Sequence, residues 1–141
     1  MLGIFLDLIK VLLSLVIGAF LGIERRRAGK PAGLRTLSLV SSSCTLAVVA
    51  GMTAFPNDVS RIIQGMLTGI GFLGAGLIIS HRGTVFGLTT AATIWTTAII
   101  GIAIGLGEFT LALAAFAITY LVLEMVHMED VIVSVGQKKS K

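Results

Sequence analysis

Few residues of this chain could take part in chemistry, because only 13% of its 141 residues are charged. The most concentrated group lies at residues 24–35, where Glu24 and Arg25 begin the segment and Arg35 ends it. A guanidinium can hold a carboxylate or a phosphate through two parallel hydrogen bonds. The simpler interpretation is that Glu24 pairs with an arginine while the other basic side chains bind membrane lipid. The sharper hypothesis is a bidentate pair between Arg35 and Glu24.

Other ionisable groups offer weaker cases for a site. Asp7 and Lys10 are spaced i, i+3, which predicts an ion pair on one helical face, with an ion relay as the alternative. Glu124 and His127 form a single E-x-x-H, whereas a ferritin-like metal site needs two such pairs and further carboxylates. Cys44 lies among small residues and is predicted to pack in a helix. We expect no metal, no cofactor and no catalytic residue, and therefore not an enzyme.

The run at residues 69–74 matches G-x-G-x-x-G, the dinucleotide-binding fingerprint. That motif requires a preceding strand, a following helix and an acidic residue about 20 positions later. Here it lies inside an apolar run, and the next acidic residue is Glu108. The missing context argues against a nucleotide site.

The elements that must position these residues are apolar runs separated by short charged clusters. Hydrophobic residues make up 55% of the chain and the mean hydropathy is +1.00, which is typical of an integral membrane protein. We predict an all-α polytopic fold with five transmembrane helices in residues 1–126, followed by a short cytoplasmic tail at 127–141 that could contain a strand at 131–133. The predicted spans are residues 2–23, 34–55, 61–80, 88–106 and 109–126.

Glycines at helical spacing predict how the spans pack, since a missing side chain lets two helices approach closely in a membrane. Three GxxxG pairs lie within the predicted spans, and the span at 61–80 carries glycine on two faces, which predicts a central helix. The predicted packing positions are Gly18, Gly22, Gly65, Gly69, Gly71, Gly74, Gly76, Gly101 and Gly105.

The net charge of +4 is interpreted as membrane topology, because no aromatic-interleaved basic patch indicates nucleic-acid binding. Of the eleven Lys and Arg residues, five lie in segment 25–35, one is Arg82 and three lie in the tail. The positive-inside rule makes these three regions cytoplasmic, with the N-terminus outside. Six residues are then expected to converge on one cytoplasmic patch: Glu24, Arg25, Arg35, Thr36, Thr89 and Thr90.

Three stretches resemble the MgtC/SapB family of bacterial inner-membrane proteins. They are Gly22-Ile-Glu-Arg25 with Pro31-Ala-Gly-Leu-Arg-Thr36, Arg61-Ile62 leading into Gly69-Ile-Gly-Phe-Leu-Gly-Ala-Gly76, and Gly87-Leu-Thr-Thr-Ala-Ala92 with Trp95 and Gly101. MgtC-type members can carry asparagine where this chain has Thr89. Many members continue into a soluble C-terminal domain, whose function is expected to be absent here or supplied by another chain.

The resemblance implies a role in growth at low magnesium and in survival of stress or of the host phagosome. For MgtC-type members it also implies restraint of the proton-driven ATP synthase. Two function classes follow. The first is a regulator acting through helix contacts, with a homodimer or a membrane complex such as ATP synthase as partner. The alternative is a small cation transporter or channel, in which Thr89, Thr93 and Thr96 would coordinate the ion.

Overall fold

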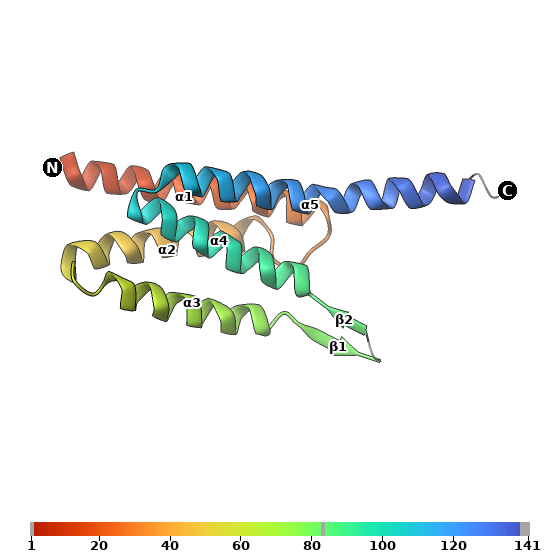
Figure 1. Cartoon of the computed structure of the whole chain (residues 1–141), viewed down its shortest axis with the longest axis horizontal. Coiled ribbons are helices and arrows are strands. Elements are labelled where there is room, and N and C mark those ends of the chain that lie inside the picture. Colours follow the sequence, from red (N-terminus) through yellow and green to blue (C-terminus); the bar gives the residue numbers. More distant parts are fainter. Residues whose placement is uncertain (1, 83, 139–141) are drawn as a thin grey trace.

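The computed structural model describes the backbone of residues 2–82 and 84–138, and the side-chain surroundings of residues 3–82 and 84–125. It is an all-α structure, as predicted, with one short β-hairpin (Figure 1). The elements are α1 (Leu2–Arg27), α2 (Leu34–Ala54), α3 (Val59–Ala75), β1 (Ile79–His81), β2 (Thr84–Phe86), α4 (Leu88–Leu106) and α5 (Phe109–Lys138).

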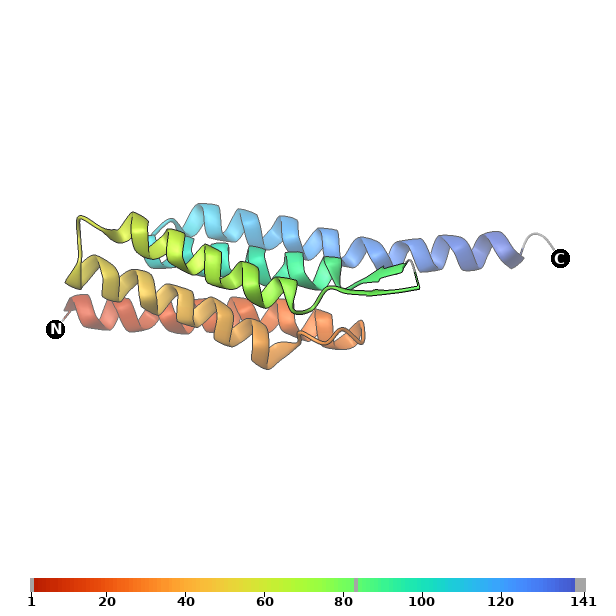
Figure 2. The same ribbon diagram turned by 90° about the horizontal axis from the view of Figure 1, so that it is seen from below.

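The five helices lie roughly along one axis, and α2 and α4 form the centre of the bundle (Figures 1 and 2). Helix α2 contacts α1, α3 and α4, while α4 contacts all four other helices. Helix α3 lies at the periphery, and Gly74 is its one buried residue. The prediction that this glycine-rich helix is central was therefore wrong. Its glycines leave its outer face bare instead of admitting neighbours on several sides.

Glycines set the start and the end of α4. Gly87 precedes the helix with φ +86°, and an added Cβ there would overlap the carbonyl of Leu77. Gly107 follows the helix with φ +88°, and the next amide, of Glu108, donates to the carbonyl of Ala103 at 2.9 Å. This is the glycine-terminated helix end in which a left-handed residue lets the chain satisfy the last carbonyls. The predicted bounds of this span, 88–106, agree with the structure.

Two other predictions, the end of the third span at residue 80 and the strand at 131–133, were wrong. Helix α3 ends at Ala75, and the chain then forms the antiparallel hairpin in which Ile79 pairs with Phe86 and His81 with Thr84. β-Branched Ile78 and Ile79 favour this extended backbone. At the other end of the chain, α5 continues as a helix to Lys138, so residues 131–133 are helical and not a strand. The C-terminal turns of α5 extend past the rest of the bundle (Figure 2).

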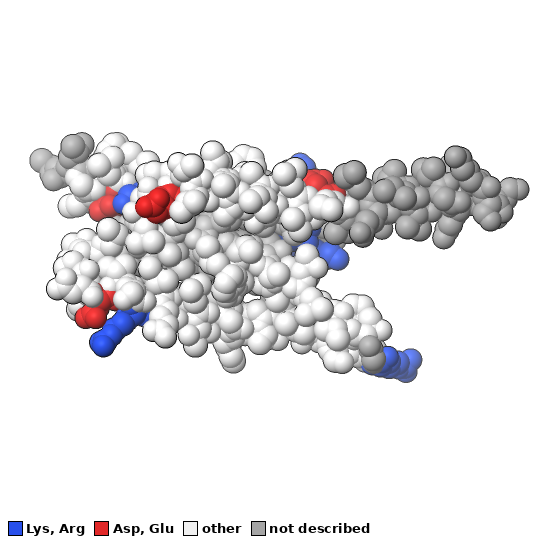
Figure 3. All heavy atoms as spheres, in the orientation of Figure 1, with Lys and Arg blue, Asp and Glu red and all other residues white. Residues whose placement is uncertain are grey.

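The surface of the bundle is apolar. Large hydrophobic side chains such as Leu39 and Leu121 are exposed on several helices. Coloured charged atoms lie toward the two ends of the molecule, with a wide uncharged band between them (Figure 3). By length and composition, α1, α2 and α4 can each cross a bilayer, whereas the apolar parts of α3 and α5 are shorter. The architecture is that of a membrane protein.

Two of the three GxxxG pairs lie against another helix. A methyl group added to Gly18 or Gly22 would overlap the backbone of α2, at Leu37 and Leu34. On α4, a Cβ on Gly101 would overlap the carbonyl of Ser41. One on Gly105 would lie 2.7 Å from Val48 Cβ. The third pair differs: an added Cβ on Gly65 or Gly69 meets no atom within 4 Å, and neither does one on Gly71.

Candidate functional site

The polar residues singled out in the sequence lie at one end of the bundle. Glu24 and Arg25 are in the last turn of α1, Arg35 and Thr36 in the first turn of α2, and Thr89 and Thr90 in the first turn of α4. These three helix ends lie at the same end of the molecule in both views (Figures 1 and 2). The six residues at this end of the bundle are here called the α1–α2–α4 cluster.

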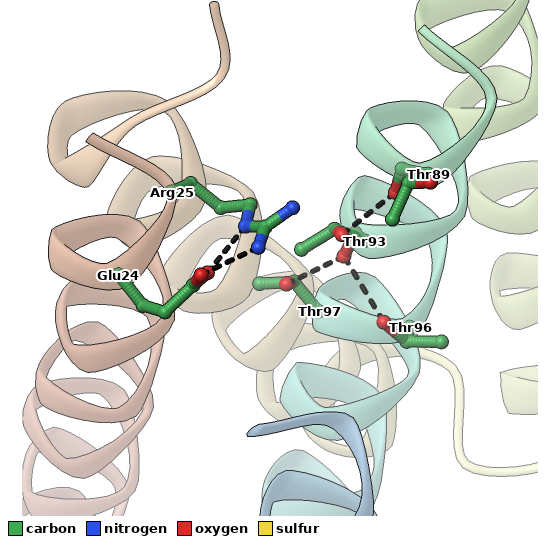
Figure 4. A network of polar contacts seen from close by, with 6 residues as sticks. All are labelled: Glu24, Arg25, Thr89, Thr93, Thr96 and Thr97. Atoms are coloured by element: carbon green, nitrogen blue, oxygen red, sulfur yellow. Dashed lines mark hydrogen bonds and ion pairs between the residues drawn. The ribbon is translucent and has the colours of Figure 1, made fainter. Parts of the chain in front are cut away.

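The cluster contains a buried ion pair. Arg25 Nε and Nη2 donate to the two carboxylate oxygens of Glu24, the second at 2.5 Å. The two side chains are only 1% and 3% exposed. Figure 4 shows the pair on α1 facing the threonine-rich start of α4. A carboxylate and a guanidinium can share such a dry position only because each neutralises the other.

The predicted pair between Glu24 and Arg35 was wrong. Both oxygens of Glu24 bind Arg25, and Arg35 is exposed and absent from the ion pairs of the described side chains. Consecutive residues on a helix point about 100° apart, so sequence spacing gives little signal for a pair between neighbours. The one signal in the sequence was that Glu24 and Arg25 both directly follow the last apolar turn of α1.

The other members of the cluster differ in burial. Thr90 is buried, whereas Thr36 and Thr89 are exposed with Arg35. The buried members, Glu24, Arg25 and Thr90, are called the inner part of the cluster, and the exposed members, which solvent or lipid can reach, are called the outer part. The outer part can contact a ligand or a partner.

After Thr90 along α4, threonine hydroxyls donate hydrogen bonds to carbonyls of the same helix. Thr93 Oγ1 donates to the carbonyl of Thr89 at 2.7 Å, and Thr97 Oγ1 donates to the carbonyl of Thr93 at 2.7 Å. Thr96 Oγ1 donates to the Thr93 carbonyl at 3.1 Å (Figure 4). Back-bonding of this kind satisfies a hydroxyl without a ligand.

At the opposite end of the bundle, Lys10 binds the C-terminus of α4. Its Nζ lies 3.8 Å from Asp7 Oδ1, which confirms the predicted ion pair, and it donates to the carbonyl of Gly105 at 3.2 Å. A cation there complements the negative end of the helix dipole. No sequence pattern points to this second contact, since the two residues are 95 positions apart.

Sequence reasoning also missed two polar contacts inside the bundle. The hydroxyls of Ser14 on α1 and Ser41 on α2 lie 2.8 Å apart. Thr45 Oγ1 on α2 donates to the carbonyl of Gly101 on α4 at 2.7 Å. Both contacts lie at glycine or serine positions where two helices approach closely. They join α1, α2 and α4 in an apolar surrounding, where polar partners are scarce.

The described side chains contain no group of three or more His, Cys, Asp and Glu residues placed to hold a metal ion. The Glu124 pairing with His127 lies outside the described side chains, because His127 is among those not described.

Comparison with known proteins places the chain in a family. Residues 11–130 match the MgtC family. The chain is 43% identical to Protein SrpB of Synechococcus elongatus, in an alignment that covers 81% of this chain and 71% of SrpB. It is 43% identical to Protein MgtC of Salmonella typhimurium (77% of this chain, 47% of MgtC). It is 38% identical to the "Putative magnesium transporter YhiD" of Escherichia coli K12 (85% of this chain, 60% of YhiD).

The chain thus spans most of SrpB but only about half of the length of MgtC. No solved structure matches it. The match covers all of the α1–α2–α4 cluster and all of α2, α3 and α4. On the family match and these identities, the resemblance seen in the sequence is confirmed, and the chain belongs to the MgtC/SapB family of membrane proteins.

Proposed function

We propose that this protein is a regulator of membrane complexes in adaptation to low magnesium or stress, acting through helix–helix contact in the bacterial inner membrane. The restraint of ATP synthase that the family resemblance implies makes that complex the first partner to test. The magnesium connection is supported by the name of the relative YhiD. Contact, as opposed to transport, is supported by the packing of the chain.

The observation that carries the proposal is the outer face of α3. Gly65, Gly69 and Phe72 share one helical face, by their spacing of four and three residues. No atom lies within 4 Å of an added Cβ at either glycine, and Phe72 is 82% exposed. The face offers a bare backbone beside a large aromatic side chain, which is the surface that another transmembrane helix can approach closely. The other two GxxxG pairs already have neighbours within the chain.

The ionisable groups argue in the same direction. Beside and within the spans, Glu24 is neutralised by Arg25 and Asp7 by Lys10, and a third carboxylate, Glu124, lies near the end of the fifth span. Transport paths generally use charged or histidine side chains that exchange partners, or broken helices that expose their carbonyls. Here Glu24 and Asp7 have partners in the same helix, Glu124 lies away from the middle of its span, and the hydroxyls of Thr93, Thr96 and Thr97 bond to their own backbone.

The alternative, a small cation transporter or channel, is favoured by one feature. A cavity of about 190 Å³ lies between α4 and α5, bordered by Thr89, Thr93 and Thr96. Purified protein in sealed vesicles should nevertheless show no magnesium flux above empty vesicles, because a hard dication prefers charged oxygen ligands. Saturable uptake that disappears in Thr93→Val would favour the transporter.

For the topology we propose five spans, with the N-terminus outside and the C-terminus cytoplasmic. Helix α3 has 17 residues, and the apolar part of α5 also has 17, which is at the short end of the usual range for a span. Both lie beside α4 within the bundle. Single cysteines at Asn57 and Glu108, in a Cys44→Ser background, should react with an impermeant thiol reagent outside the cell, and one at Ala28 should not.

The function is tested by growth at limiting magnesium in a strain without its native copy. Gly69→Leu fills the bare face and should abolish complementation. Gly71→Leu is the matched control: it makes the same change two residues away on another side of α3, where an added Cβ also meets no atom within 4 Å. Membrane levels of both variants must equal those of the parent.

Whether the regulated complex is ATP synthase is tested by measuring ATP-driven proton pumping in inverted vesicles from the same strains. Parent protein should lower the pumping rate, Gly71→Leu should behave as the parent, and Gly69→Leu should restore the rate. If both variants complement growth as well as the parent, the outer face of α3 has no regulatory contact and the proposal is wrong.

A further inference from the structure

A second feature, at the outer part of the α1–α2–α4 cluster, is a recess formed by the turn between α1 and α2. It has a volume of about 620 Å³. This is within the range of about 300–1,000 Å³ that is usual for small-molecule sites. Its lining residues are Arg26, Lys30, Pro31, Gly33, Leu34, Arg35 and Thr36.

The charge of the recess is positive and not compensated by its own lining. Arg26, Lys30 and Arg35 are all exposed, and the lining contains no acidic residue. The nearby carboxylate, Glu24, is buried and bound by Arg25. None of the three ion pairs among the described side chains includes a cation of the recess. Three cations converging on one concavity attract a ligand with more than one negative oxygen.

The backbone adds donors to the same recess. Helix α2 begins at Leu34, and its N-cap residue, Gly33, supplies no side-chain hydrogen bond. The first amides of a helix have no partner within the helix. Here they lie beside Arg35 and the hydroxyl of Thr36, so the recess combines guanidinium, ammonium, hydroxyl and amide donors. That donor set fits tetrahedral phosphate oxygens.

The recess also lies at the border between the apolar surface of the bundle and its basic segment. Ile23 is exposed on α1 just before the basic segment, and Leu34 and Pro31 line the recess itself. A ligand there would meet cations on one side and hydrocarbon on the other. This is the environment of a lipid headgroup, although a soluble phosphate compound can reach it from the water.

We propose that the recess between α1 and α2 is a binding site for a phosphate-bearing anion, held by Arg26, Lys30 and Arg35. The site is separate from the outer face of α3, so it does not depend on the proposed regulatory contact. Arg26 and Arg35 supply planar forks for two phosphate oxygens, and Lys30 supplies a point charge. The source is either an anionic phospholipid or a soluble phosphate compound.

The test measures binding to the purified full-length chain in two arms. In the first, native mass spectrometry records the retention of phosphatidylglycerol against phosphatidylcholine. In the second, calorimetry records the binding of ATP to protein held in phosphatidylcholine nanodiscs. Arg35→Gln should weaken binding about tenfold in whichever arm shows it, because charge-assisted hydrogen bonds are lost. Arg26→Gln should have a similar effect.

Arg82→Gln is the matched control, since it removes the same charge from an exposed position in the hairpin that does not line the recess. It should leave binding within about twofold of the parent. Thermal unfolding of each variant checks that the fold is kept. Phosphatidylglycerol binding identifies a lipid ligand, and ATP binding identifies a soluble one. Absence of binding in both arms, or equal losses in Arg82→Gln and Arg35→Gln, would overturn the proposal.

Discussion

The same sequence signal, a pair of glycines four residues apart, has two different outcomes in this protein. Gly101 on α4 lies so close to α2 that the carbonyl of Ser41 occupies the space of a Cβ. Gly69 on α3 lies in open space, with no atom within 4 Å of a Cβ. In the first region glycine holds α1, α2 and α4 together, and in the second it leaves a helix face available.

The comparison shows that GxxxG marks a helix that can be approached, without saying which neighbour approaches it. Where polar groups lie beside the glycines, as Thr45 does beside Gly101, the contact is satisfied within the chain. The outer face of α3 has no such internal contact. Substitutions in the first region should therefore lower the stability of the fold. Substitutions on the outer face of α3 should instead weaken the contact with a partner.

The largest expected effect comes from the buried ion pair next to the packed region. Arg25→Leu leaves the Glu24 carboxylate in a dry position without its partner, which should cost about 3–5 kcal/mol of stability. Arg35→Leu, which removes an exposed arginine from the same cluster, should cost less than about 0.5 kcal/mol. Thermal or denaturant unfolding in detergent measures both. Equal losses would mean that the Glu24–Arg25 pair contributes no more than a surface charge.

A smaller loss of stability is expected for Gly101→Ala. The added methyl group has to displace the backbone of α2 at Ser41, and overpacking of this kind costs about 1–3 kcal/mol. The measurement is the shift of the unfolding midpoint relative to the parent. An unchanged midpoint would show that α2 and α4 can separate freely, and that the close approach at Gly101 contributes nothing to the fold.

The smallest effect should come from Gly69→Ala. Nothing lies near the added methyl group, and alanine favours a helix over glycine, so stability should be unchanged or rise by less than about 1 kcal/mol. The same unfolding measurement applies. A loss as large as that of Gly101→Ala would mean that α3 packs through its glycine face, and the contrast between the two regions would not hold.

Much of the fold could be predicted from sequence because glycines interrupt the apolar runs at defined points. Gly33, Gly87 and Gly107 lie just outside helix ends, and the spans beginning at Leu34, Leu88 and Phe109 start where predicted. The end of α3 could not be predicted in the same way. The apolar run continues into Ile78 and Ile79, and apolarity alone does not distinguish a helix from a strand.

The site was predicted only in part, for a different reason. The sequence brings Glu24, Arg25 and Arg35 to one end of the bundle, but the choice of Arg25 as partner depends on side-chain directions at the last turn of α1. The depth of α3 in the bundle was predicted wrongly because glycine spacing indicates possible contact on any side. Which helix, if any, contacts each glycine face is decided by the packing of the whole chain.

Whether the outer face of α3 contacts another membrane complex is measured by photo-crosslinking from that face in living cells at limiting magnesium. Phe72, which is 82% exposed, is replaced by p-benzoyl-phenylalanine; Leu121 on α5, which is 65% exposed, is the control position. We expect a discrete adduct with a subunit of another membrane complex from position 72 and none from position 121. No protein adduct from position 72, the same adduct from both positions, or an adduct consisting only of two copies of this chain would contradict this expectation.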